Sequence, residues 1–94
     1  MLRHEKRHKL QIFYEILCAI QDDMLHNDNL AKPTHVQHYS RLSYDKMIIH
    51  FAELERKGML QRHDNGLVSI SDRGLIFLKQ YDDLITFIDG VGLK

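Results

Sequence analysis

The chain has 94 residues, of which 44% are hydrophobic and 28% charged, a balance that predicts one globular domain and argues against disorder. Its 13 basic and 13 acidic side chains give a formal charge of zero, which argues against a protein that coats polyanions without selectivity. No apolar run reaches the roughly 20 residues that span a bilayer, the first ten residues lack the apolar core of a signal peptide, and the single cysteine, Cys18, cannot form an internal disulfide. We therefore expect a cytoplasmic protein with no membrane segment.

The first predicted helix runs from Glu5 to about Met24. Its apolar residues recur at helical spacing and form one stripe: Phe13, Ile16, Leu17, Ile20 and Met24. Leu10, Tyr14 and Cys18 flank this stripe, which predicts that the helix is covered on more than one side.

A polar segment, residues 26–32, predicts a loop, and Pro33 then suits the first turn of a short helix because its missing N–H is not needed there. This helix should end near Arg41 and has few side chains to bury: Val36, Tyr39 and Leu42. Ser43 is a suitable N-cap for the next helix.

The third helix, about residues 43–57, should bury Met47, Phe51 and Leu54, which recur at helical spacing. Ile48 also suits a core position, whereas Ile49 does not fit the buried stripe. Lys57 and Gly58 place a cation in the last turn and a glycine just after it, a pattern typical of a helix end.

The period then changes to that of a hairpin, with strands Met59–His63 and Leu67–Ile70 joined by the turn Asp64-Asn65-Gly66. Ser71 is expected to cap a last helix, in which Gly74 permits close packing. The order of elements predicts an α+β winged helix-turn-helix over residues 1–94: three helices, a β-hairpin wing at 59–70 and a long C-terminal helix whose residues 75–92 serve dimerisation.

The motifs "KPTH", "LSY" and "KGML", followed by Ile70-Ser71-Asp72-Arg73-Gly74 and Phe77-Leu78, carry a family resemblance. Over about residues 5–81 the chain resembles the small archaeal winged-helix regulators, which include dimeric ten-kilodalton chromatin proteins. The resemblance implies a regulator or chromatin-type protein that binds duplex DNA. The chain departs from the family pattern at Ser40, Arg41 and His50, and it has isoleucines at 48 and 49, where relatives are often polar.

The winged-helix arrangement places the start of the third helix in the major groove, the groove wide enough for a helix. The expected DNA contacts there are Arg41, Ser43, Tyr44, Lys46, Ile49 and His50. The wing offers Arg62, His63 and Asn65, and the basic N-terminal segment offers Lys6 and Arg7 as phosphate contacts. Two alternatives remain open. The charged residues can be an ordinary solvated surface, and Ile48 and Ile49 can contact a protein partner instead of nucleic acid.

The C-terminal helix carries more apolar residues than a domain of this size can bury. The expected dimer contacts are Tyr81, Leu84, Ile85, Phe87 and Ile88, because a monomer seldom exposes such a stripe. The predicted assembly is a homodimer; the alternative is a monomer whose last helix folds back over the first.

The seven histidines include ligand-compatible pairs, His4 with His8 and His35 with His38, but no second cysteine accompanies them. Capping or solvated histidines are therefore the preferred interpretation, and a metal or pH sensor the remote one. The sequence has no nucleophile elbow and no phosphate-cradling glycine loop. We predict neither an enzyme nor a metal or other cofactor.

Overall fold

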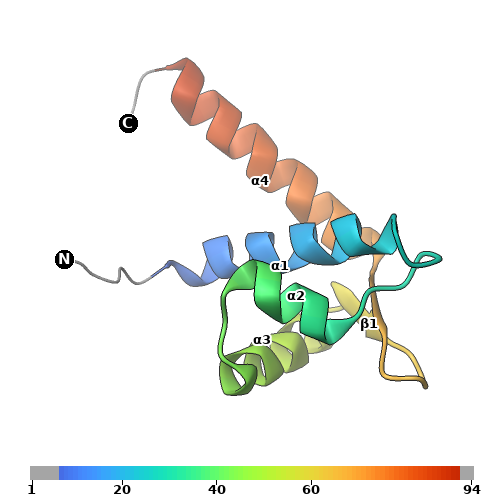
Figure 1. The fold of residues 1–94 in the computed structure, drawn as a ribbon. Coiled ribbons are helices and arrows are strands. Elements are labelled where there is room, and N and C mark those ends of the chain that lie inside the picture. The colour runs from blue at the N-terminus through green and yellow to red at the C-terminus, as the bar shows by residue number, and fades with distance from the viewer. Residues whose placement is uncertain (1–6, 92–94) are drawn as a thin grey trace.

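The computed structural model describes residues 7–91 as four helices and a two-stranded antiparallel sheet (Figure 1). In chain order these are α1 (Lys9–Met24), α2 (Pro33–Ser40), α3 (Tyr44–Arg56), β1 (Leu60–Arg62), β2 (Val68–Ile70) and α4 (Asp72–Gly90). The α+β class is confirmed, and the order and kind of the elements are compatible with the expected winged helix. Within residues 7–91 we find no helix with the length and apolar character needed to cross a membrane.

Helix α1 begins later than expected, at Lys9. His8 is extended and acts as the N-cap, because its ring nitrogen accepts a hydrogen bond from the N–H of Leu10 at 3.1 Å. The predicted apolar stripe is buried except for the half-buried Met24. Leu10, by contrast, is exposed, so the first turn of α1 is not covered as predicted; the expected start, Glu5, lies outside the described residues.

Helices α2 and α3 meet at a tight corner. Pro33 occupies the first turn of α2, and the helix ends at Arg41, whose backbone is left-handed with φ 54°. Ser43 caps α3 as predicted, since its Oγ accepts a hydrogen bond from the N–H of Lys46. Tyr39 was expected to be buried but is 66% exposed.

The hairpin pairs Leu60 with Ile70 and Arg62 with Val68, so both strands are shorter than predicted. The chain turns at Asn65-Gly66, where Gly66 has φ 85°, a conformation that costs glycine little. The sequence did not reveal that the loop before α2 joins the sheet: the backbone N–H and C=O of Ala31 both bond to Val68, at 3.0 Å or less. This bridge anchors the start of α2 to the hairpin.

The core lies where α1, α2, α3, the hairpin and the start of α4 converge. Its side chains are apolar and nearly inaccessible to solvent: Phe13, Ile16, Leu17, Ala19, Ile20, Ala31, Val36, Met47, Phe51, Leu54, Leu60, Val68 and Leu78. Met47, Phe51 and Leu54 are among them as predicted, whereas Ile48, which also suited a core position, is exposed. This core fixes α3 beside the hairpin.

Helix α4 begins at the predicted cap, because Ser71 Oγ accepts a hydrogen bond from the N–H of Gly74. Leu78 closes the core, whereas Leu75, three residues earlier, is exposed. The Tyr14 hydroxyl of α1 donates to Asp82 at 2.6 Å and its ring stacks on Tyr81, with 4.3 Å between centroids. Beyond this contact α4 diverges from α1 and projects away from the other elements (Figure 1).

Candidate nucleic-acid interface

The outer face of α3 is open to solvent along its N-terminal half. Tyr44 is 62% exposed and Ile49 61%, and Lys46 is exposed beside them. Met47 and Phe51 anchor the opposite face in the core, so the orientation of the helix is fixed by burial. The structure therefore leaves all three of these expected contact residues exposed in the first half of α3.

Arg41 and Ser43 stand just before this face. Ser43 is exposed, but its hydroxyl oxygen is already used by the helix cap. Arg41 is exposed and lies at the left-handed corner, which only asparagine, aspartate and glycine adopt readily. The corner holds its Cα in a fixed place relative to the first turn of α3.

His50 is not on the open face. Its ring is half-buried and meets the edge of the Phe13 ring at a centroid distance of 6.0 Å. The Nδ1 atom is buried and has no hydrogen-bond partner among the described residues. Burial lowers the pKa of His50, and the positive charge of Lys46 lowers it further, although Glu53 opposes the shift. This placement makes His50 a contact between α3 and α1, with its ring turned away from where DNA would lie.

The hairpin presents Arg62 in the last residue pair before its turn, within reach of Glu55 near the end of α3. Its Nε donates to Glu55 Oε1 at 2.8 Å, and its guanidinium lies 5.9 Å from the ring centroid of Phe51. The ion pair is solvent-exposed on both sides, and such pairs contribute little stability. Arg62 can therefore exchange Glu55 for a phosphate at small cost.

The remaining wing residues are partly used by the hairpin itself. The ring of His63 lies 2.9 Å from Ser69 Oγ across the sheet. Asn65 Oδ1 accepts the N–H of Leu67 at 3.1 Å, which closes the turn. Both residues are nevertheless exposed, at the tip of the hairpin.

Of the N-terminal basic segment, the structure describes Arg7 and the residues after it. Lys6 lies outside the described residues. Arg7 is mostly buried; it pairs with Glu15 and donates to the backbone carbonyl of Ser40 at 2.9 Å. Arg7 thus links the start of α1 to the end of α2, so its guanidinium serves the fold. Lys9 pairs with Glu53 of α3 at 3.0 Å.

One exposed cation on α3 was missed by the sequence analysis. Arg56 lies seven residues after Ile49, and two turns of helix bring it to the same exposed side. The seven-residue interval between Ile49 and Arg56 was the sequence signal that could have identified it. Arg56 extends the candidate surface toward the hairpin.

The expected dimer residues form an exposed apolar surface on the projecting part of α4. Leu84 is 54% and Phe87 62% exposed, and Ile85 is also exposed, while Tyr81 and Ile88 are half-buried. Tyr81 is the member that contacts α1. The fold therefore leaves most of this stripe without a partner from residues 7–91.

The histidines among residues 7–91 do not form a cluster of metal ligands. Among residues 7–91 no three histidine, cysteine or carboxylate side chains gather as metal ligands would. His35 contacts Asp23 at 3.0 Å, and His8 caps α1; His4 lies outside the described residues.

A comparison with protein-family models and a search of curated proteins found no match to this chain. The features that bear on function are therefore the exposed first half of α3 and the hairpin beside it.

Proposed function

We propose that the protein is a winged-helix DNA-binding regulator or chromatin-type protein that acts as a homodimer. The observation that carries this proposal is the open N-terminal half of α3, held beside a β-hairpin by a core on its other side. A helix exposed in this way fits the major groove, while the hairpin lies along the neighbouring backbone.

Tyr44, Lys46 and Ile49 are the proposed base-reading residues. The Tyr44 hydroxyl and the Lys46 ammonium supply hydrogen bonds to base edges, and Ile49 supplies apolar contact with a thymine methyl group. Their exposure supports this assignment. His50, which faces Phe13, is better assigned to positioning α3 against α1.

Phosphate contacts are proposed for three exposed arginines: Arg41 in the corner before α3, and Arg56 and Arg62 near the end of α3. With about three cations per protomer, a dimer neutralises on the order of six phosphates, and log affinity then falls with log salt at a slope of about −5. The acidic residues near the same face, Asp45 and Glu53, limit affinity at physiological salt.

The proposed dimer contact is the α4 stripe. Phe77, Tyr81, Leu84, Ile88 and Val91 follow one another alternately four and three residues apart, the spacing with which two helices pack side by side. Phe77 packs against the core and Tyr81 against α1. Leu84, Ile88 and Val91 continue the same face of α4 past these contacts. A second copy of the chain carries the same stripe, so a two-fold pairing of α4 helices covers both at once.

Fluorescence anisotropy with a labelled mixed-sequence duplex, titrated at several salt concentrations, tests the DNA proposal. Wild type should bind more weakly as salt rises, and Arg62→Ala should weaken binding and reduce the steepness. Lys79→Ala is the matched control, because Lys79 lies on α4 and pairs with Asp83 far from α3. Binding that is absent at low salt, or equally weakened by both substitutions, rejects the proposal.

A second candidate function has one observation in its favour. Tyr44, Ile48 and Ile49 together expose apolar surface at the start of α3, and such surfaces commonly mark protein contacts. In this alternative the same face binds a protein partner and no nucleic acid. The protein-partner alternative is favoured if the DNA affinity of wild type shows no salt dependence and Ile49→Ala leaves that affinity unchanged.

A further inference from the structure

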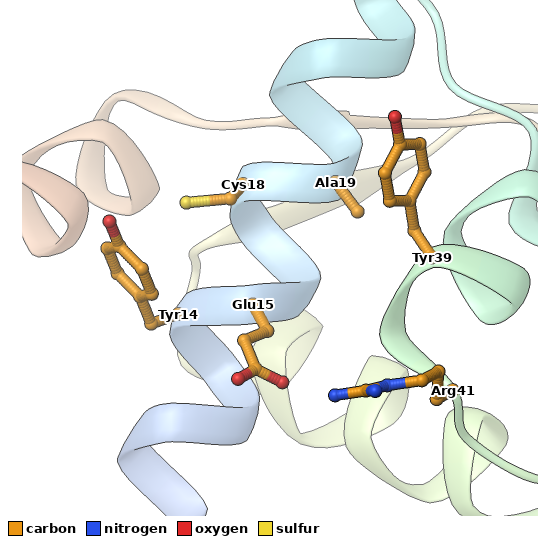
Figure 2. A pocket seen from close by; sticks show the side chains of 6 residues that line it. All are labelled: Tyr14, Glu15, Cys18, Ala19, Tyr39 and Arg41. Carbon is orange, nitrogen blue, oxygen red and sulfur yellow. The ribbon is translucent and has the colours of Figure 1, made fainter.

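A cleft opens over the middle of α1, away from the proposed base-reading residues. It has a volume of about 270 Å³ and is lined by Tyr14, Glu15, Cys18, Ala19, Tyr39 and Arg41. The first four come from α1, Tyr39 from α2 and Arg41 from the corner before α3 (Figure 2). This size is near the lower end of the range for small-molecule sites and suits one ring with a short substituent.

The cleft is apolar at its floor and aromatic at its sides. Ala19 is buried and belongs to the floor of the cleft, where its small side chain leaves space open, and Cys18 precedes it in α1. Figure 2 shows the Tyr39 ring beside Ala19 and the Tyr14 ring on the other side of α1. A planar apolar group binds well against a ring such as that of Tyr39, because it covers an aromatic face that water otherwise contacts.

The charges of the cleft favour an anion. The carboxylate of Glu15 is already paired, with Arg7 on one oxygen and with the side-chain amide of Gln11 on the other. The Arg41 side chain is exposed and extends from the corner across the cleft, with its guanidinium directed toward Glu15 (Figure 2). A guanidinium offers a carboxylate two parallel N–H donors, an arrangement that a lysine cannot match.

The backbone of Arg41 adds a further observation. With φ 54° the residue is strained, and glycine or asparagine would fit the corner more easily. The side chain at this position therefore carries a cost to the fold, which is consistent with a use for its guanidinium.

We propose that this cleft is a binding site for a small aromatic carboxylate, with the Arg41 guanidinium holding the carboxylate and the ring lying over Ala19 against Tyr39. The ligand class follows from a flat apolar floor, an aromatic wall and a cation at one end.

The site has a consequence for DNA that depends on the proposed function. Arg41 is one of the proposed phosphate contacts, and it directly precedes Leu42 and the cap of α3. A carboxylate bound by its guanidinium competes with phosphate for the same donors. The ligand should therefore weaken DNA binding.

The direct test is an amide-resolved NMR titration of the full chain with benzoate, which is ionised at neutral pH. Saturable shifts should appear at Cys18, Ala19, Tyr39 and Arg41. Benzyl alcohol lacks the charge and acetate lacks the ring, so each should bind at least about tenfold more weakly. Equal shifts from benzyl alcohol, or shifts scattered over other surfaces, overturn the proposal.

Arg41→Gly is the decisive variant, because glycine accepts the left-handed backbone and the fold should persist. Benzoate affinity should fall at least about tenfold, while Arg56→Ala, which removes an equally exposed arginine elsewhere, should leave it unchanged. A second measurement uses the one thiol in the chain. Saturating benzoate should slow alkylation of Cys18 by iodoacetamide in wild type and not in Arg41→Gly. Unchanged benzoate affinity in Arg41→Gly rejects the site.

DNA binding separates the two proposals. Benzoate, compared with sodium chloride at equal ionic strength, should weaken the duplex affinity of wild type and leave that of Arg41→Gly unchanged. If the NMR titration succeeds but no duplex binds, the cleft stands and the DNA proposal fails. If the duplex binds but benzoate gives no saturable shifts, the benzoate-site proposal is rejected and the DNA proposal stands.

Discussion

Gly74 lies where α4 leaves the hairpin, and replacing it with alanine should destabilise the fold. A Cβ at this position would lie 2.5 Å from the backbone oxygen of Met59 and 2.6 Å from Ile70 Cγ1, both far inside contact distance. That oxygen also accepts the N–H of Ser71 at 3.1 Å, so it cannot move without disturbing the start of α4. The substitution therefore strains the junction between the proposed wing and the proposed dimer helix.

The size of the effect follows from two opposed contributions. Alanine favours the helix by about 1 kcal/mol over glycine. Overpacking against a rigid neighbour costs about 1–3 kcal/mol and sometimes more. Because the nearest atom is a backbone oxygen, we expect the clash to prevail, with a net loss of about 1–2 kcal/mol. For a chain of this length that lowers Tm by at least about 4 °C.

Thermal unfolding followed by circular dichroism, at one fixed protomer concentration, measures this loss. Gly90→Ala is the matched control: it is also in α4, but a Cβ there meets no atom within 4 Å. It should leave Tm unchanged or raise it slightly. A Gly74→Ala variant as stable as Gly90→Ala refutes the packing described at this junction.

Three other predictions concern the cap, the dimer and pH. Ser43→Ala removes the hydrogen bond to the Lys46 N–H and should lower the free energy of unfolding by about 1 kcal/mol in urea titrations; no change would contradict the cap. Leu84→Lys should convert a dimer to a monomer in analytical ultracentrifugation, whereas Thr86→Lys, which adds the same charge outside the heptad stripe, should not; dissociation by both, or by neither, contradicts the proposed pairing. Burial lowers the pKa of His50, so the folded protein takes up that proton less readily than the unfolded chain does. Stability should therefore fall as pH drops below about 6.5, and His50→Gln should reduce this dependence; an identical pH profile for the two proteins would refute it.

Local signals in the sequence predicted most element boundaries. Ser43 and Ser71 both cap helices through their hydroxyls, and Asn65-Gly66 forms the hairpin turn. These signals succeed because each depends on hydrogen bonds or backbone preferences within a few residues. The buried stripes of α1 and α3 were predicted for a similar reason, since one helix face must meet the core.

The errors concern contacts between elements distant in sequence. Ala31 joins the sheet through Val68, a partner 37 positions away that no local pattern indicates. Leu10, Tyr39 and Leu75 have apolar or aromatic character but find no neighbour to cover them. Such residues show that hydrophobicity permits burial without requiring it.

The candidate site was predicted in its location more than in its chemistry. Helical spacing placed Lys46 and Ile49 outside the buried stripe, as the structure has them. The same spacing does not show that His50 turns toward Phe13, or that Arg62 pairs with Glu55. Those partners depend on how α1 and the hairpin pack against α3.

The most direct measurement for the proposed function is an amide NMR map of a short duplex bound at low salt. We expect shifts concentrated at residues 43–49 and at the hairpin around residues 62–66, with α4 beyond residue 84 unaffected. Shifts confined to other surfaces, or no saturable change along α3, would contradict the claim that this helix enters a DNA groove.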